Sequence, residues 1–343
     1  TNTTGSNNTA LGRSALDQTT TGANNTAVGY NSLYANTTAS EMCAFGAEAL
    51  MTSDTEAYNN AFGYQALKVA NGGRFNTAVG WTCMKSLTTG DDNTGLGHDV
   101  MPSLTTGNKN TALGSNALYA LTTGTQNTAV GQAALDANTT GISLTAVGSD
   151  ALGANSTGSY NDAFGVNALK TNTTGTSNAA IGYNTLFYNT TGGNNVAVGR
   201  NALHSNTTAS NNTALGYNAL LLTTTGADNV AIGYNSLDAN TTASFNTGVG
   251  AYSLTANTTG TCNDAVGYYA LNTNTTGGYN VAFGSRSLQS NTTADNNVAI
   301  GRDALRLNTT GSNNVAVGYN SLDANTTGNN NIAVGPYCLD ANT

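Results

Sequence analysis

The sequence predicts an all-β fold, a parallel β-solenoid (β-roll) of about 20 coils with 17 residues each. One glycine recurs every 17 residues from Gly12 to Gly335, which gives 20 glycines without an insertion or deletion. The residues around each glycine also keep the same order, as in the stretch from Asn314 to Leu322. A single unit repeated in fixed register indicates coils stacked on one another. Positions are counted here from this glycine, which is position 0.

The residues beside the glycine predict a strand. Position −1 is large and apolar in every repeat, position −2 is Ala in 18 repeats and Gly in two, and position +4 is Leu in 18 repeats. Apolar residues at positions −1 and +4, with Thr, Val or Ile common at position −3, suit a strand that buries one face, so we expect positions −1 and +4 to be buried. The small residues at position −2 predict a close approach by the opposite side of the coil or by a neighbouring subunit.

The rest of the repeat predicts turns and a polar ladder. A polar segment that contains a glycine, such as that from Asp323 to Gly328, follows the leucine at position +4. Each coil is therefore expected to hold two short strands and two turns. Asn and Thr are poor helix formers, and 17 residues are too few for two helices. Position −4 is Asn in 18 repeats, which predicts a ladder of amide hydrogen bonds along the stack.

The repeat makes residues 1–343 a single array, with divergent coils at about residues 41–121. This stretch contains Trp81, and position −10, which is usually Asn, is occupied there by Leu87, Leu104 and Leu121. Three leucines on an otherwise polar edge, beside a tryptophan, predict an exposed apolar contact patch. Drift of the repeat explains the same residues equally well.

Composition excludes several classes of function. Charged residues make up 8% of the chain and the net charge is −8, so a nucleic-acid partner is not expected. No apolar run is long enough to span a membrane. His98 and His204 lie in different phases of the repeat, and no nucleophile, phosphate-binding or calcium-binding motif occurs. Asp238 and Asp323 are interpreted as solvated turn residues. We therefore predict no catalytic residue, cofactor or metal site, and no enzyme.

The clearest chemical motif is Asn-x-Ser/Thr at position −10, the acceptor for N-glycosylation. In a cell that glycosylates this motif, the asparagines would carry a column of sugar along one edge. The alternative is that Asn and Thr serve turn hydrogen bonds and stacking. Asn7, Asn24 and Asn211 begin the same motif in another phase. The candidate sites at position −10 are Asn2, Asn36, Asn138, Asn155, Asn172, Asn189, Asn206, Asn240, Asn257, Asn274, Asn291, Asn308 and Asn325.

The repeated phrase resembles those of known surface proteins. The stretches from Asn25 to Gly29 and from Asn229 to Gly233 resemble the head repeats of trimeric autotransporter adhesins. They are still more similar to the Asn/Thr-rich repeats of phage-tail-fibre-like surface proteins. The resemblance implies a left-handed parallel β-roll, assembly as a homotrimer, and a role in adhesion. The coil is longer here than in the adhesin heads.

These observations predict a non-catalytic structural fibre or adhesin segment, placed outside the cell, at its surface or in a virion fibre. The expected partners are further copies of the chain, as a homotrimer or a head-to-tail filament, and a glycan or another cell-surface ligand. The Ala/Gly face fits a trimer axis or the interior of a flattened monomeric solenoid. An ice-binding or carbohydrate-binding β-solenoid is the alternative. Thr326 and Thr327 are adjacent in a turn and should point in different directions, which disfavours a flat ice-binding face.

Overall fold

The computed structural model describes residues 2–55 and 57–341, and it confirms the predicted fold class. The chain is an all-β parallel solenoid with one strand in each 17-residue turn, and no helix occurs in the described residues. It divides into two compact units, Thr1–Thr174 and Gly175–Thr343, and each is described by itself.

The strands are three residues long. Those of the first unit are β1 (Thr9–Leu11), β2 (Thr26–Val28), β3 (Cys43–Phe45), β4 (Asn60–Phe62), β5 (Thr77–Val79), β6 (Thr94–Leu96), β7 (Thr111–Leu113), β8 (Thr128–Val130), β9 (Thr145–Val147) and β10 (Asp162–Phe164). Those of the second unit are β11 (Ala179–Ile181), β12 (Val196–Val198), β13 (Thr213–Leu215), β14 (Val230–Ile232), β15 (Thr247–Val249), β16 (Asp264–Val266), β17 (Val281–Phe283), β18 (Val298–Ile300), β19 (Val315–Val317) and β20 (Ile332–Val334).

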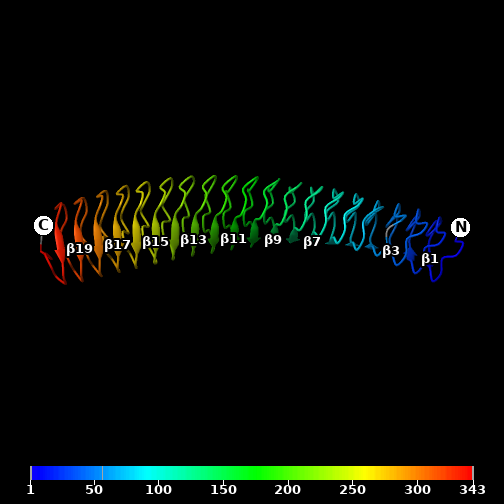
Figure 1. Ribbon diagram of the computed structural model, residues 1–343, viewed down its shortest axis with the longest axis horizontal. Coiled ribbons are helices and arrows are strands. Elements are labelled where there is room, and N and C mark those ends of the chain that lie inside the picture. The colour runs from blue at the N-terminus through cyan, green and yellow to red at the C-terminus, as the bar shows by residue number, and fades with distance from the viewer. Residues whose placement is uncertain (1, 56, 342–343) are drawn as a thin grey trace. The chain divides into compact units, whose positions relative to one another are not determined.

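Each strand pairs in parallel with the strand of the next coil in its unit (Figure 1). The register joins residues 17 apart, as between β14 and β15, where Ala231 pairs with Gly248 and Ile232 with Val249. Residues at one repeat position therefore stack directly above one another. Each position of the repeat becomes a column of like side chains.

The coil has one strand and not the two that the sequence predicted. The second half of each coil, after the glycine, forms turns instead. Two of its residues, at positions +2 and +4, have left-handed backbone angles, with φ of 50° at Asn235 and 52° at Leu237. An extended strand cannot pass through such residues, because they reverse the local direction of the chain.

The glycine at position 0 is required by the approach of the next coil. At Gly148 the backbone has φ of +138°, a region that side chains rarely adopt. A Cβ atom there would lie 2.4 Å from the carbonyl oxygen of Gly165. Because each coil repeats this contact, no larger residue can take the position, and the glycine keeps its register.

The side of the strand that faces the interior is the opposite of the predicted one. Ala231 at position −2 is fully buried, as is Leu237 at position +4. The large residues at position −1 face outward instead, and Leu215 and Phe283 are 46% and 55% exposed. A 17-residue coil with a leucine from its far side leaves room only for alanine or glycine beneath the strand. The predicted close approach to position −2 is thus made by the opposite side of the same coil.

The predicted amide ladder at position −4 is present in the interior. The Nδ2 of Asn93 donates to Asn76 Oδ1 (3.1 Å) and to the carbonyl oxygen of Gly107 (2.9 Å). The Oδ1 of Asn93 accepts from the backbone N–H and the Nδ2 of Asn110, both at 3.0 Å. These buried amides therefore have partners for both polar atoms, which removes most of the cost of burying them.

Candidate functional site

The candidate glycosylation sites form a second interior ladder. The asparagines at position −10 are fully buried, except for Asn2, which is exposed. The Nδ2 of Asn274, for example, donates to Asn257 Oδ1 (2.8 Å) and to the carbonyl oxygen of Gly277 (2.9 Å). A glycan would have to be attached to this same nitrogen, and the folded coil has no space for it. The geometry favours the hydrogen-bonding interpretation at position −10. The asparagines of the motifs in the other phase, Asn7, Asn24 and Asn211, are exposed.

The predicted contact patch is not exposed. Leu87, Leu104 and Leu121 are fully buried, because position −10 points into the coil. The three leucines stack where the other coils have the asparagine ladder, so the interior accepts either kind of column. Trp81 is the exposed member of the predicted patch, at 54%, and its ring lies 4.4 Å from that of Tyr64.

The two threonine columns point in different directions, as predicted. The hydroxyl of Thr275, at position −9, donates to the carbonyl oxygen of Thr292 (3.0 Å) in the next coil, and its side chain is half-buried. Thr276, at position −8, is exposed. Half of the hydroxyl groups are therefore already bound to the backbone and do not form a flat, free array.

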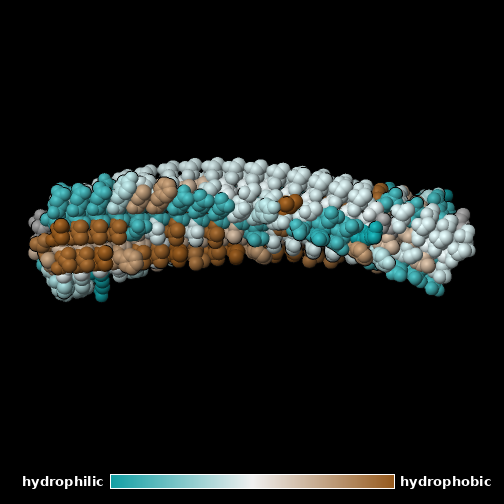
Figure 2. Space-filling view, in the orientation of Figure 1, coloured by the Kyte–Doolittle hydropathy of each residue, from teal (hydrophilic) through white to brown (hydrophobic). Residues whose placement is uncertain are grey.

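The outward residues at position −1 form a continuous apolar surface in each unit, which we call the outer stripe. None of its members in the described residues is buried. In the C-terminal coils valines and an isoleucine at position −3 add a second apolar row, and Figure 2 shows the two rows over these strands. The added residues are Val281, Val298, Val315 and Ile332. The large apolar residues at position −1 are evident in the sequence, but their size suggested that they were buried.

Five tyrosines form a continuous cluster beside the outer stripe in the second unit, which we call the tyrosine array. It consists of Tyr217, Tyr234, Tyr252, Tyr268 and Tyr269 at positions +1 and +2 of four successive coils. The stacked pairs are Tyr217–Tyr234 and Tyr252–Tyr269, with ring centroids 5.3 Å and 4.9 Å apart. Tyr234 and Tyr252 meet edge to face at 5.2 Å, as do Tyr268 and Tyr269 at 4.3 Å. The sequence signal was tyrosine at these positions in consecutive coils, which our sequence reasoning did not use.

Polar groups adjoin the tyrosine array. The hydroxyl of Thr255 donates to the carbonyl oxygen of Asn235 (3.1 Å). The side-chain Nδ2 of Asn272 donates to the carbonyl oxygen of Tyr252 (3.1 Å). Asp238 is half-buried, and its Oδ1 has no hydrogen-bond partner among the described residues. Burial raises the pKa of Asp238 to about 6, so this residue is not the solvated carboxylate that the sequence suggested. Asp323, interpreted in the same way, accepts a hydrogen bond from Arg306 Nε (2.9 Å).

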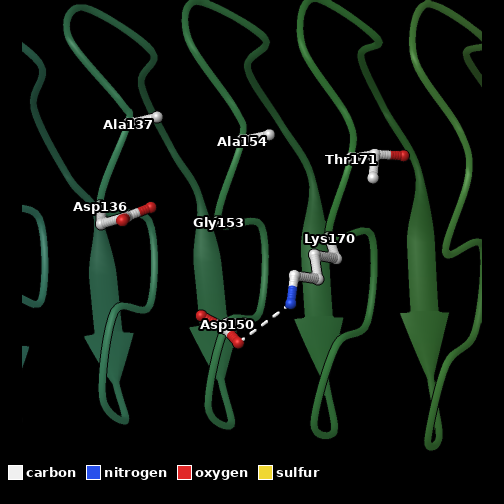
Figure 3. A pocket seen from close by; sticks show the side chains of 7 residues that line it. All are labelled: Asp136, Ala137, Asp150, Gly153, Ala154, Lys170 and Thr171. Atoms are coloured by element: carbon white, nitrogen blue, oxygen red, sulfur yellow. Dashed lines mark hydrogen bonds and ion pairs between the residues drawn. The ribbon is translucent and has the colours of Figure 1, made fainter.

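A small notch of about 340 Å³ lies in the first unit (Figure 3). It exists because Gly153 has no side chain at position +5, where the neighbouring coils carry Asp136 and Lys170. Lys170 Nζ lies 3.1 Å from Asp150 Oδ2, while burial, with a smaller effect of Asp150, raises the pKa of Asp136. The notch is lined by Asp136, Ala137, Asp150, Gly153, Ala154, Lys170 and Thr171. One of its two carboxylates is already paired with Lys170, and the notch is open to solvent.

Neither histidine belongs to a group of potential metal ligands among the described residues. No group of three or more His, Cys, Asp and Glu side chains that could hold a metal occurs in residues 2–55 and 57–341. His204 stacks on Phe187 at 5.5 Å, and burial lowers its pKa. The Nδ1 of His98 lies 3.3 Å from the Oδ2 of Asp99. In the described part of the chain, no helix has the length and apolar character needed to cross a membrane.

Comparison with protein-family models and with curated proteins finds no match to this chain.

The leucine column at position −10 yields a first prediction. Leu104→Asn should lower the free energy of unfolding by about 1–3 kcal/mol, because the new amide would lie between two leucines without a ladder partner. Leu104→Met, which conserves volume, should cost less than about 1.5 kcal/mol. Denaturant unfolding of both variants measures the difference. An Asn variant that is as stable as the parent but associates less would restore the exposed-patch hypothesis.

Asp238 yields a prediction on pH. Its folded-state pKa of about 6 lies above the ordinary value of 3.8, so its contribution to stability is present below about pH 4 and is lost as the pH rises through 6. Asp238→Asn should therefore raise the melting temperature relative to the parent at pH 8, with a smaller or no gain at pH 4. Asp92→Asn, at an exposed position outside the strands, is the control and should show no such trend. An equal effect of Asp238→Asn at both pH values would contradict the assigned pKa.

Proposed function

We propose that this chain is a non-catalytic structural segment of an extracellular fibre or adhesin, at a cell surface or in a virion fibre, and that it self-associates through the outer stripe. The observation that carries this proposal is the outward direction of position −1. An unbroken column of Val, Leu, Ile and Phe on the outside of every coil is unusual for a chain that stays alone in water. Burial of this column against a partner would be strongly favourable.

A second copy of the chain is the partner that fits this surface. The residues of the stripe recur once per coil, and only another stack with the same coil spacing can match such a column over many coils. The column contains no charged residue at position −1, and on the same face position −3 is charged only at Asp162 and Asp264. The stripe also extends to position −3 in the C-terminal coils, where the two apolar rows widen the surface.

A homotrimer is the assembly that the resemblance to adhesin heads supports. The axis would then be lined by positions −1 and −3 of three copies. The Ala/Gly face that the sequence offered for this role lies inside the coil and is not available for it. Columns of side chains on the remaining faces would stay accessible to ligands, as an adhesin requires.

The self-association proposal predicts a mass three times the 34.6 kDa of the chain. Leu215→Glu combined with Phe283→Glu should reduce the assembly to the single-chain mass, because two rings of glutamates would be desolvated in the interface. Light scattering after size-exclusion chromatography, or sedimentation equilibrium, measures the mass of parent and variant.

Leu222→Glu is the matched control, since Leu222 is 47% exposed at position +6, away from the stripe. It should leave the mass of the assembly unchanged. A parent chain that remains a monomer at high concentration would refute self-association through the stripe, as would an assembly that tolerates both glutamates.

A further inference from the structure

We infer that the tyrosine array is a binding site for an uncharged polysaccharide chain. The inference rests on the proposed role as an adhesin and names its ligand class. The array unites five aromatic rings on one surface of four consecutive coils, and every ring contacts at least one other. Tyr217, Tyr234 and Tyr268 are 40%, 47% and 53% exposed, so their rings remain accessible.

The spacing of the rings follows the spacing of the coils. Successive coils place ring centroids 5.3, 5.2 and 4.9 Å apart along the array. In the coil that contains β15, position +1 is Ala251 and not tyrosine. There Tyr252, at position +2, contacts Tyr234. The ring planes are nearly parallel within the pairs Tyr217–Tyr234 and Tyr252–Tyr269, and they turn by 65° between Tyr234 and Tyr252. Because stacked rings cover part of one another's faces, a linear polymer of ring-shaped units laid along the row would contact the ring edges and the uncovered parts of the faces of several tyrosines.

The chemistry of the row matches a sugar better than a purely apolar ligand. A pyranose ring presents C–H groups on its faces, which pack on aromatic rings, and hydroxyl groups at its edges. The phenol hydroxyls of Tyr234 and Tyr252 hydrogen-bond to each other, as do those of Tyr268 and Tyr269, and the remaining hydrogen-bonding capacity of these groups is open to sugar hydroxyls. Asn235 and Asp238 add polar side chains in the neighbouring columns. A mainly aromatic surface with a few polar groups is typical of a ligand site.

The charge of the surface disfavours anionic polymers. The array itself contains no Lys or Arg, and Asp238 lies close enough to Tyr252 for its charge to be felt there. Arg200, at position +1 of the coil next to Tyr217, lies over the ring of Tyr183, 5.6 Å from its centroid. The whole chain carries a net charge of −8. Stacking of nucleic-acid bases on such rings would require a basic surface to bind the phosphates. An uncharged polysaccharide needs no such cations.

Native gel electrophoresis through gels that contain a neutral polysaccharide tests the inference. The probes are hydroxyethylcellulose, galactomannan and soluble starch, and the readout is the retardation of the folded chain relative to a gel without polysaccharide. We expect retardation in at least one of the three gels. In that gel, Tyr234→Ala combined with Tyr252→Ala should weaken the apparent affinity by about tenfold, because two stacking rings are lost. Tyr234→Phe combined with Tyr252→Phe keeps the rings and should remain within about threefold of the parent.

Tyr160→Ala is the control, since Tyr160 is 58% exposed and lies outside the array. It should bind as the parent does. Circular dichroism confirms that each variant is folded, and Tyr217→Ala, at the end of the array, replaces the double variant if that variant does not fold. Absence of retardation of the parent in all three gels would overturn the inference, and so would unchanged retardation of the alanine variants.

The mass of the same variants separates this site from the self-association proposal. The tyrosine variants should keep the mass of the parent assembly, whatever that mass is. If the alanine variants instead lose the assembly together with retardation, the array belongs to the contact between copies and the polysaccharide site is refuted. If the parent proves monomeric but is retarded, self-association fails and the polysaccharide site stands.

Discussion

Hydrogen bonds between buried asparagine amides hold each coil to the next, and the other features of the coil depend on them. Two such columns run through the interior, one at position −4 and one at position −10. Where a column is unbroken, as at Asn93 and Asn274, the amide bonds to the amide of a neighbouring coil and to a backbone carbonyl. A thin coil cannot bury enough apolar surface to be stable alone. The amide columns add directional contacts in every coil, which fix the register as well as the spacing.

The narrow interior explains why the large apolar residues lie outside. Amides, one leucine at position +4 and small residues at positions −2 and +3 fill most of the space between the walls of the coil, so the strand can direct only its small residue inward. The residue at position −1 must then face outward, whatever its size. A surface of this kind follows from the geometry of the coil, yet its uniformly apolar composition does not. Threonine or lysine would fit an outward position equally well, and the consistent choice of apolar residues supports a contact with further copies.

The repeat and the ladder at position −4 could be predicted from the sequence, because both depend only on period and residue type. The sequence did not allow us to predict which side of the strand faces the interior. Alternation assigns Ile232 and Ala231 to opposite faces, but it does not say which face is enclosed, and the usual preference of large apolar residues for the interior pointed to the wrong one. The same difficulty misplaced Leu104 on the surface. The turn at Asn235 and Leu237 was missed because leucine rarely adopts left-handed angles.

The central claim is that alanine faces the interior and its large neighbour faces outward, and thiol labelling at two adjacent residues of β14 tests it most directly. Ala231→Cys and Ile232→Cys would be made in a chain whose own cysteines are replaced by serine and whose outer stripe carries the Leu215→Glu and Phe283→Glu substitutions. The structure predicts that the thiol at position 232 reacts rapidly with a maleimide, whereas the thiol at position 231 reacts only as fast as the coil unfolds. Rapid labelling at 231 with protection at 232 would contradict the account.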